Sequence, residues 1–454
     1  MKRVLIISLF FPPLRGIASL RPGKWAKYLP DSGYWPIVVT ADKSAYDELD
    51  LPVEVTRGEI HEVPYFNPLM EGRKRLAPSH APRPADKGTP DNRGFREAVF
   101  RLGIRLIRPF ESRGCLTVPA RMPSFCEFWA LSSARVVQRV LRRYGGDVRA
   151  MISSSGPPAS HLLAWYVKWK HPEIRWIADF RDLWTQNPHF PGMFPFTWLE
   201  KALERRILSR ADAVVTVSEG LARVLRVHCG GKVHVIENGF DEEELESIPA
   251  RISSPRDFTL AYTGMVYVSR QDPIPLFSAL KGFAGRRETQ GSPGILVRFL
   301  VANRQGKEYL QGLVESFGLG EIVRVDSAVP YREAIAIQKG ADALLLLEKE
   351  QDAPNDQGVL TGKVFEYLAA RKPILGVGFG PEGELGKLMV ASGLGFPMGR
   401  DVSRIQQALE RMISAKNSGA MYRLVNPDEA FIARYSRKSQ AARLAGLLDS
   451  LVGE

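Results

Sequence analysis

The 454-residue sequence is poor in cysteine and has no long apolar segment, and both absences narrow what the protein can be. Its three cysteines, Cys115, Cys126 and Cys229, have neither the number of a disulfide framework nor the spacing of a zinc site. No run of about 18 consecutive apolar residues exists, so we expect no transmembrane helix. A protein of the reducing cytoplasm fits these features.

The N-terminus resembles a secretory signal peptide only superficially. Residues 1–13, MKRVLIISLFFPP, join a charged start to a short apolar run, but no A-x-A-like cleavage site follows. We therefore interpret this run as a first, buried β-strand. The turn after it also lacks the G-x-G-x-x-G fingerprint, which argues against a nicotinamide-dependent dehydrogenase.

The positive charge of the chain is concentrated in one segment. The formal net charge is +12, and residues 71–149 alone hold 17 Lys and Arg against 7 Asp and Glu. Within this segment, residues 94–110 combine an apolar helical stripe with arginines. The stripe is Phe95, Val99, Leu102 and Leu106, and the arginines are Arg96, Arg101, Arg105 and Arg108. Such a helix can bind an anionic membrane surface, whereas a solvated basic helix is the alternative. Nucleic-acid binding is the weakest option, because no recognisable module accompanies the charge.

Short apolar runs alternate with helical patterns along most of the chain. This alternation predicts an α/β protein with parallel sheets that are covered on both faces. Two such series predict two doubly wound, Rossmann-like domains. The runs that predict strands are 4–10, 36–40, 150–155, 175–180, 213–218 and 233–238, then 258–264, 295–301, 322–327, 341–348 and 373–378.

The composition also indicates domain boundaries. We expect an N-terminal domain in residues 1–241 with a basic, Pro-rich insertion at about 67–125. An acidic stretch that then turns Ser- and Pro-containing, residues 242–257, predicts a linker. The second domain is expected in residues 258–426. The C-terminal segment, 427–454, has helical periodicity and is expected to pack back toward the first domain.

Ligands of open α/β sheets bind at the carboxyl ends of the strands, so the turns after the predicted strands are the candidate sites. After the first strand, Gly16 would let a ligand approach the backbone, and Arg21 lies in the following helix. A plain strand-to-helix turn is the alternative. After the run 150–155, His161 begins a helix and either faces a ligand or is a satisfied structural histidine.

A charged cluster follows the run 175–180. Asp179, Arg181 and Asp182 place three charges within four residues, which a hydrophobic core would not use. We expect polar contacts with a hydroxylated substrate or a general base. An ion-paired structural turn is the alternative.

The stretch 358–375, GVLTGKVFEYLAARKPIL, opens a helix with unfavourable residues. Gly362 costs about 1 kcal/mol relative to Ala in a helix, and Lys363 lies at the positive end of the helix dipole. A bound anion would resolve both oddities, because helix N-termini bind phosphate. Together with Thr361, these residues are expected to hold phosphate, and Glu366 would accept hydrogen bonds from a ribose diol.

A second phosphate contact is expected after the run 258–264. Gly264 ends this run and Arg270 follows closely, and a glycine plus a cation at a strand end suits a diphosphate.

Several segments together resemble a known enzyme family. ADAVVTVSE, VHVIENGFD, LAYTG and FEYLAARKPIL, in this order and spacing, are similar to the family-four glycosyltransferases of the GT-B fold. SLFFPPLRG, RPGKWAKYLP and ADFRDLW resemble a branch found in bacterial surface-polysaccharide gene clusters. The resemblance covers nearly the whole chain except the basic insertion. It implies two Rossmann-like domains that face each other across a cleft. The donor nucleotide sugar would bind mainly to the C-terminal domain and the acceptor mainly to the N-terminal domain.

The resemblance also implies residue roles. The family's donor motif has two glutamates separated by seven residues, and Glu366 matches the second, which contacts the ribose. Gly358 occupies the position of the first, so the usual contact with the donor sugar is in doubt. Glu348 or Asp356 could replace it. Arg270 takes the approximate place of the cation that neutralises the diphosphate, supplemented by Lys363.

The remaining assignments follow from these roles. The candidate catalytic residues are Asp179, Asp182, His161, Arg270 and Lys363. The candidate donor-binding residues are Gly16, Gly264, Arg270, Thr361, Gly362, Lys363 and Glu366. The candidate acceptor-binding residues are Arg21, Asp179 and Arg181.

The expected function is transfer of a sugar from a nucleotide-diphosphate sugar to a lipid-linked or polysaccharide acceptor in cell-surface glycan biosynthesis. The family implies that neither a metal nor a further cofactor is needed, and that anomeric configuration is retained. The enzyme is expected in the cytoplasm, with peripheral binding at the inner face of the plasma membrane through residues 94–110. Nucleotide-sugar 2-epimerases share the fold and are one alternative. A degenerate, nucleotide-binding scaffold is another.

Overall fold

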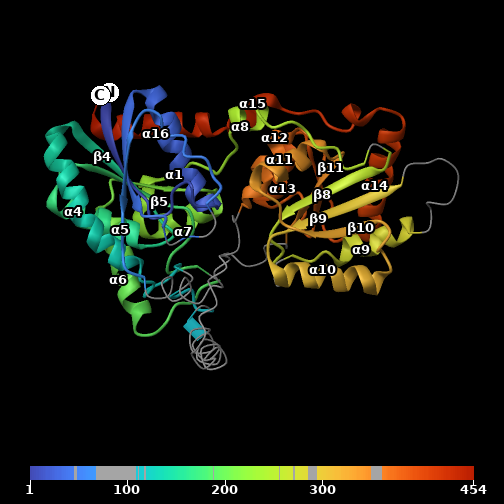
Figure 1. The fold of residues 1–454 in the computed structure, drawn as a ribbon, viewed down its shortest axis with the longest axis horizontal. Coiled ribbons are helices and arrows are strands. Elements are labelled where there is room, and N and C mark those ends of the chain that lie inside the picture. The colour runs from blue at the N-terminus through green and yellow to red at the C-terminus, as the bar shows by residue number, and fades with distance from the viewer. Residues whose placement is uncertain are drawn as a thin grey trace, which may run out of the picture. The chain divides into compact units, whose positions relative to one another are not determined.

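The computed structural model describes most of the chain, and its described residues form two compact units (Figure 1). These residues are 1–44, 46, 49–67, 109–110, 112–116, 119–187, 189–254, 256–268, 271–284, 294–348 and 360–453. Unit 1 comprises Met1–Val217, Leu221–Ile236 and Ala441–Glu454, and unit 2 comprises Ser218–Gly220 and Glu237–Gln440. Arg270 and residues 94–108 of the predicted basic helix lie outside the described residues.

Unit 1 is built on a parallel sheet. Within the described residues it has seven strands in the order β3-β2-β1-β4-β5-β6-β7. The strands are β1 (Lys2–Ile7), β2 (Tyr34–Ala41), β3 (Glu59–Val63), β4 (Val148–Ser154), β5 (Arg175–Phe180), β6 (Ala213–Thr216) and β7 (Val233–Val235). In the centre, Ile6 of β1 is in register with Val38 of β2 on one side and Ile152 of β4 on the other.

Helices cover both faces of this sheet. They are α1 (Ile17–Tyr28), α4 (Cys126–Tyr144), α5 (Ala159–Lys170), α6 (Phe196–Arg210), α7 (Glu219–Cys229) and, from Ala441 on, α16 (Arg437–Val452). Side chains alternate along a strand, so Val4 and Ile6 of β1 pack on the side of α1 and α16. Leu5 and Ile7 pack on the side of α4, α5 and α6. Burial on both faces explains why the strand sequences are almost continuously apolar.

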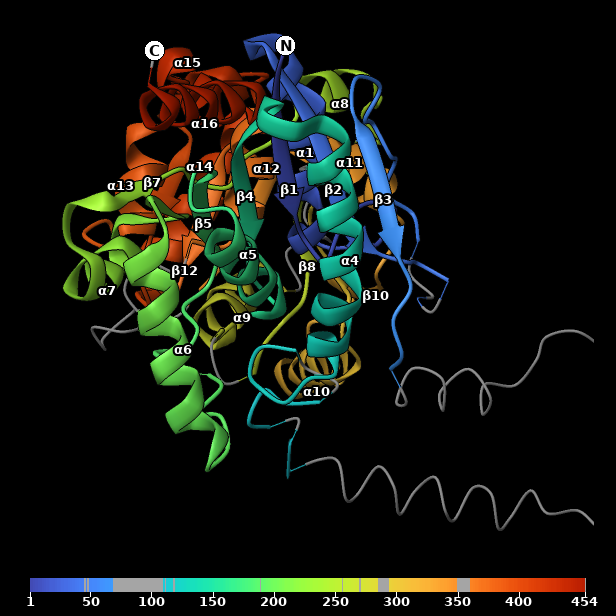
Figure 2. The same ribbon diagram turned by 90° about the vertical axis from the view of Figure 1, so that its left-hand side faces the viewer.

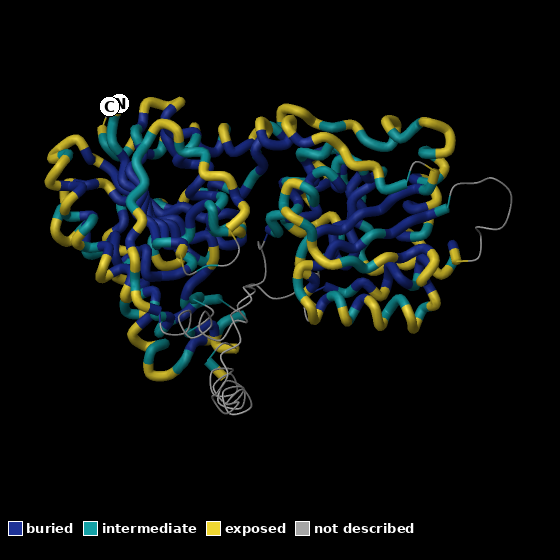
Figure 3. The backbone as a smooth tube through the Cα atoms, in the orientation of Figure 1, coloured by how far each residue is buried: buried dark blue, intermediate teal, exposed yellow. Residues whose placement is uncertain are grey.

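Unit 2 repeats the plan. Its described residues form a six-stranded parallel sheet in the order β10-β9-β8-β11-β12-β13. The strands are β8 (Phe258–Gly264), β9 (Ile295–Val301), β10 (Val323–Ser327), β11 (Ala343–Leu347), β12 (Ile374–Val377) and β13 (Gly395–Pro397). As in unit 1, the strands form the buried centre of the unit (Figure 3).

The helices of unit 2 also lie on both faces of its sheet. One face is covered by α9 (Ile274–Leu280), α10 (Arg304–Phe317) and α14 (Val402–Asn417). The other is covered by α8 (Glu242–Glu246), α11 (Tyr331–Gly340), α12 (Gly362–Ala370), α13 (Glu384–Ala391) and α15 (Glu429–Ala433).

The predicted fold class is confirmed: both sheets are parallel, doubly wound and ordered as in Rossmann-like domains. Two strands escaped the sequence analysis, β3 at one edge of the first sheet and β13 at one edge of the second. The predicted linker, residues 242–257, begins with α8 and lies within unit 2. Of the helices that the structure describes, none combines the length and the apolarity needed to cross a membrane.

Candidate active site

The N-terminus of α12 is the most distinctive polar feature of unit 2. The helix begins at Gly362, after Thr361 in an extended conformation (φ −65°, ψ 137°). The Thr361 side chain makes no capping hydrogen bond. The first N–H groups of a helix have no intrahelical partner and lie at the positive end of its dipole. This terminus therefore has the groups that bind an anion.

Lys363 is held beside this terminus by neutral oxygen atoms. Its Nζ donates to the Tyr262 hydroxyl at 2.9 Å and to the Met265 carbonyl at 3.3 Å. The ammonium also lies 4.8 Å from the centre of the Tyr262 ring. Burial lowers the pKa of Lys363. Since neither oxygen partner is a carboxylate, the ammonium is positioned without a direct ion pair to either of them.

Gly264, at the end of β8, is in direct contact with Lys363. Its φ is +121°, a region that side-chain-bearing residues rarely adopt. A Cβ at this position would lie 2.4 Å from Cε of Lys363. The glycine is thus needed both for its backbone conformation and for the close approach of the lysine. The structure therefore brings together two residues that the sequence analysis placed at the donor diphosphate.

Glu366 lies one turn further along α12 and is half-buried. Gln338 of α11 donates from Nε2 to Oε2 of Glu366 at 3.1 Å and to Oγ1 of Thr263 at 2.8 Å. Burial raises the pKa of Glu366, which the hydrogen bond from Gln338 and the charge of Lys363 oppose. The carboxylate is thus oriented by a neutral amide and retains free acceptor capacity.

Sequence reasoning missed the residues that orient Lys363 and Glu366. The apolar patterns assign Tyr262 only to a strand and Gln338 only to a helix. The available signal was a polar residue inside the apolar helical run AIAIQKGAD, and Gln338 is indeed only 1% exposed.

Glu348 follows β11 directly, and its charge acts on the same group of residues. After burial, the Glu348 carboxylate contributes to raising the pKa of Tyr262. It also opposes the burial that lowers the pKa of Lys363. Of the two acids predicted to replace the missing motif glutamate, Glu348 therefore lies in the electrostatic neighbourhood of the site. Asp356, like Gly358, lies outside the described residues.

In unit 1, Asp179 and Arg21 form an ion pair with both side chains fully buried. Arg21 of α1 donates to Asp179 from Nε at 3.2 Å and from Nη2 at 3.0 Å. Nη2 also donates to the Ile236 carbonyl at 2.7 Å, and the Ser154 hydroxyl donates to Asp179 Oδ2 at 2.8 Å. This geometry favours positioning of the strand end over contact with a substrate.

The other two residues of the predicted charged cluster differ in burial: Arg181 is buried and Asp182 is exposed. The Arg181 guanidinium donates to the carbonyls of Ser155 at 2.8 Å and Gly156 at 3.0 Å. Burial lowers the pKa of Arg181, and the charges of Asp182 and Asp179 oppose this shift. Asp182, in contrast, is exposed. It is therefore the member of the cluster whose carboxylate can meet a substrate.

His161 is fully buried in the first turn of α5. Its Nδ1 lies 2.7 Å from the Ser153 hydroxyl, which accepts the Trp176 indole N–H at 2.8 Å. With the Ser153 hydroxyl donating its hydrogen to Nδ1, the histidine carries its proton on Nε2. This Nε2 is buried and has no hydrogen-bond partner among the described residues. Burial, with a smaller effect of Arg181, lowers the pKa of His161 to about 3. The imidazole is therefore neutral at physiological pH.

Gly16 immediately precedes α1 with φ +131°, and no atom lies within 4 Å of where a Cβ would be. The open space beside this backbone agrees with the close ligand approach that the sequence suggested. The structure thus offers space at Gly16 and an exposed carboxylate at Asp182.

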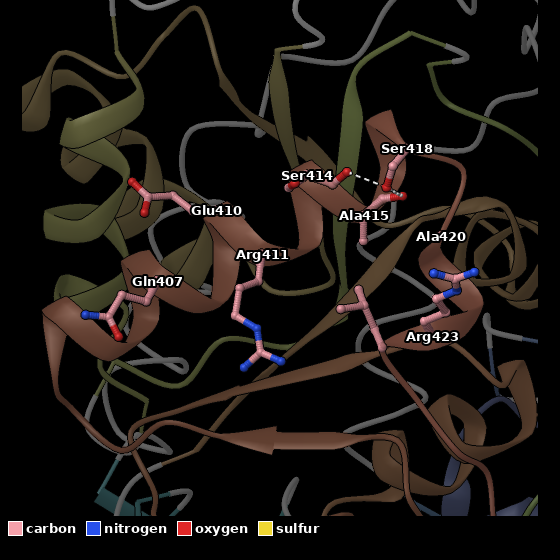
Figure 4. Close-up of a pocket in the computed structure, with 9 residues that line it drawn as sticks. Gln407, Glu410, Arg411, Ser414, Ala415, Ser418, Ala420 and Arg423 are labelled. Carbon is pink, nitrogen blue, oxygen red and sulfur yellow. Dashed lines mark hydrogen bonds between the residues drawn. The ribbon is translucent and has the colours of Figure 1, made fainter.

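A surface hollow of about 590 Å³ lies elsewhere in unit 2, along α14 (Figure 4). Glu410, Arg411 and Ser414 of α14 line it together with Arg423 and Leu424. None of the predicted site residues lines this hollow. Its mixed charges and open shape give it no evident catalytic chemistry.

Comparison with known proteins agrees with this architecture. Two parallel, doubly wound units define the GT-B class of α/β fold. Residues 91–244 match the family model described as Glycosyltransferase Family 4. This match agrees with the family predicted from the sequence, whereas the bacterial surface-polysaccharide branch stays a prediction. Among curated proteins, no sequence matches the chain.

Solved structures share the fold at low sequence identity. Sucrose-phosphate synthase from Thermosynechococcus elongatus has a TM-score of 0.60 and 14% identity, over 99% of this chain and 99% of that one. A glycosyltransferase from Rickettsia africae has a TM-score of 0.58 and 14% identity, over 100% of this chain and 99% of that one. HepE from Anabaena, solved in complex with UDP, has a TM-score of 0.58 and 12% identity, over 99% of this chain and 100% of that one.

Proposed function

We propose that this glycosyltransferase moves a sugar from a nucleotide-diphosphate sugar to a lipid-linked or polysaccharide acceptor in cell-surface glycan biosynthesis. The observation that carries the proposal is the arrangement at the start of α12. There, Lys363 is held against Tyr262 and Gly264, and Glu366 lies one turn away. HepE, which has the same fold, was solved with UDP, so uridine nucleotides are the first donors to test.

The chemistry that these residues supply is stabilisation of a leaving group. Glycosyl transfer passes through an oxocarbenium-like transition state while the nucleoside diphosphate departs. Lys363 and the N–H groups of the first turn of α12 would bind the departing phosphates, with Arg270 as a further cation. Removing one oriented contact of this type costs about 100-fold or more in turnover. A bound diphosphate also favours the charged form of Lys363, which offsets the effect of burial on its pKa.

Glu366 would bind the ribose. Its carboxylate has acceptor capacity beyond the bond from Gln338, and a ribose diol donates two hydrogen bonds. The missing first glutamate of the family motif leaves the donor-sugar contact to another acid, and Glu348 is our candidate. The transfer is proposed to need no metal and to retain configuration, as the family implies.

For the acceptor we propose Asp182 as the contact or base in unit 1, whereas Gly16 would give the donor access to the backbone. Asp179, Arg21 and Arg181 would act by holding this strand end in place. His161 is fully buried and would act only through its hydrogen bond with Ser153, because its lowered pKa excludes a cationic role near neutral pH.

We further propose that the protein meets its acceptor at the inner face of the plasma membrane, where residues 94–110 would dock. Cosedimentation with anionic vesicles that high salt releases tests this step. Replacing Arg96, Arg101, Arg105 and Arg108 with Gln should remove most of the binding while sparing nucleotide affinity.

One experiment tests the proposed function and separates it from its alternative. Nucleotide sugars are first screened for thermal stabilisation, since a ligand that binds only the native state raises its apparent stability. The best donor is then incubated with and without lipid-linked acceptor. Product that requires the acceptor supports transfer. A free epimer formed from the donor alone would instead show a nucleotide-sugar 2-epimerase, and binding without either product a scaffold.

A further inference from the structure

The exposed face of α6 has an unusual composition. Its two acids, Glu200 and Glu204, are 0% and 2% exposed. Glu200 pairs with Arg121, and Glu204 accepts hydrogen bonds from Thr185 and Gln186. The exposed ionic residues of this fully described helix are all basic: Lys201, Arg205, Arg206 and Arg210.

Large apolar side chains are exposed at the start of the same helix. Phe194, just before α6, is 82% exposed, and Trp198 is 76% exposed. Trp198, Lys201 and Arg205 are spaced by 3 and 4 residues, so they form one stripe along the helix, and Phe194 precedes its first turn. The stripe is aromatic in the first turn and basic in the turns after it.

Helix α4 repeats this pattern. Phe128 and Leu131, in its first turns, are 47% and 70% exposed. Arg135, Arg139 and Arg142 extend the same stripe at intervals of three and four residues and are exposed. The acid of α4, Glu127, is half-buried and accepts hydrogen bonds from Ser124. No residue of α4, all of which are described, is both acidic and exposed.

The two helices lie on the same face of the sheet of unit 1. Helix α5 packs against both of them, and Figure 2 shows α4, α5 and α6 side by side. The three helices follow β3, β4 and β5, which are strands of one parallel sheet. Their first turns therefore lie at the same end of the sheet, where the strands have their carboxyl ends. The exposed apolar residues of α4 and α6 therefore lie at one end of the unit, with arginines behind them.

We propose that this end of unit 1, defined by Phe128, Leu131, Phe194, Trp198 and Leu199 with the basic faces of α4 and α6, docks on an anionic lipid bilayer. Exposed aromatic residues partition to the interface between headgroups and acyl chains, and Lys and Arg bind anionic headgroups. Arg205 is seven residues beyond Trp198, about 10 Å along a helix. Insertion of the aromatic residues by about 5–10 Å would thus bring this arginine to headgroup level.

A bilayer suits this face better than bulk water or a partner protein does. A merely solvated helix has no use for a Trp and a Phe that are both more than three-quarters exposed. Both helices bury or half-bury every acid they have, so this face presents only positive charge, which the anionic headgroups of a bilayer complement. The inference rests on the lipid-linked acceptor of the proposed function, and it concerns a surface other than residues 94–110.

The test uses the full-length protein and vesicles of phosphatidylcholine with or without phosphatidylglycerol, in the absence of donor and acceptor. The variant Phe194→Ala/Trp198→Ala should bind the anionic vesicles about tenfold more weakly or worse, from the lost apolar burial. Trp169→Ala is the matched control, since Trp169 is 69% exposed near the other end of α5. It should bind like the wild type.

The basic part of the surface is tested in the same way. Arg205→Gln/Arg206→Gln should weaken binding and reduce its salt dependence, whereas Arg404→Gln/Arg411→Gln on α14 of unit 2 should not. Independently of any loss of binding, brominated lipids should quench tryptophan emission in the wild type. This quenching should fall in Trp198→Phe and persist in Trp169→Phe.

Equal binding by the Phe194/Trp198 variant and the Trp169 control would overturn the proposal, as would absence of quenching from Trp198. Equal binding to neutral and anionic vesicles would also contradict it. Calorimetric titration with UDP measures nucleotide binding independently of vesicle binding, so the docking surface and the proposed function can fail separately. A protein that binds vesicles but no nucleotide refutes only the transferase chemistry, and the converse refutes only the docking surface.

Discussion

The two polar clusters of this GT-B protein hold their charges in opposite ways. In unit 1, Arg21 and Asp179 neutralise each other inside the protein, with no exposed side-chain surface. In unit 2, Lys363 is held by a hydroxyl and a carbonyl, and Glu366 by an amide. A charge paired internally contributes to structure, because its field is cancelled where a ligand would bind. A charge held by neutral dipoles remains available to a substrate.

This contrast predicts its largest effect for the buried pair. Asp179→Asn should destabilise the protein by about 3–5 kcal/mol, because it leaves the Arg21 charge buried without its partner. Denaturant unfolding measures this loss, and exposed Asp182→Asn should shift stability by less than about 0.5 kcal/mol. If both variants were equally stable, Asp179 would not be the structural residue that its burial indicates. Asp182→Asn is expected to lower turnover more than donor affinity, because Asp182 is proposed to contact the acceptor.

The next largest effect concerns Lys363. Lys363→Ala should lower kcat/KM about 100-fold or more, since an oriented cation at the leaving diphosphate is lost. Its unfolding free energy should change much less than that of Asp179→Asn, because the hydrogen-bond partners of Lys363 are neutral. Arg411→Ala, in the hollow along α14, is the control and should retain full activity. Unchanged turnover in Lys363→Ala would remove this residue from the mechanism.

The sequence anticipated the features that depend on short-range patterns. Strands buried on both faces are continuous apolar runs, so 175–180, 258–264 and 295–301 coincide with β5, β8 and β9. Strand β3, EIHEV, has an edge position and charged residues, and it was missed for that reason. The anion site expected at the start of α12 was inferred because glycine and lysine are unfavourable there without an anion, and it stays a prediction.

Contacts between distant parts of the chain were beyond sequence reasoning. In the sequence, Asp179 is one of three clustered charges. Only the fold shows that its carboxylate is buried in an ion pair with Arg21. Nothing local marks Gln338 as the residue that orients Glu366. Such pairings are decided by how helices pack on the sheet, and a single sequence does not encode them in any periodicity.

His161 provides a smaller, pH-dependent effect on the stability of unit 1. Its pKa is lowered to about 3 in the folded protein by burial, against about 6.5 when unfolded. The unfolded state therefore binds the proton first as the pH falls, and stability declines below about pH 6.5. Between pH 7 and pH 5 this one group should cost about 2 kcal/mol.

The control for this prediction is His161→Gln, which has no titrating ring. Its unfolding free energy should fall by about 2 kcal/mol less than that of the wild type over the same pH interval. Parallel pH profiles for the two proteins would show that His161 is protonated in the native state.

Gly264→Ala should produce the smallest change, and it is confined to unit 2. A methyl group would collide with Lys363 Cε, and the flexible lysine would move to relieve the contact. We expect about tenfold weaker binding of a nucleoside diphosphate, equal to about 1.4 kcal/mol. Gly318→Ala, at the end of α10, also has a positive φ but open space beside it, so it should leave this affinity unchanged. Equal effects of the two substitutions would mean that the lysine contact is irrelevant.

The most direct test of the donor site compares a nucleoside diphosphate with its monophosphate by calorimetric titration. Lys363 is assigned to the diphosphate and Glu366 to the ribose that both ligands share. The wild type should bind UDP, or the diphosphate of whichever base it prefers, more tightly than the monophosphate. Lys363→Ala should lose this preference, whereas Glu366→Ala should weaken both ligands equally and keep it. An unaltered preference in Lys363→Ala would contradict the claim that α12 and its lysine hold the donor diphosphate.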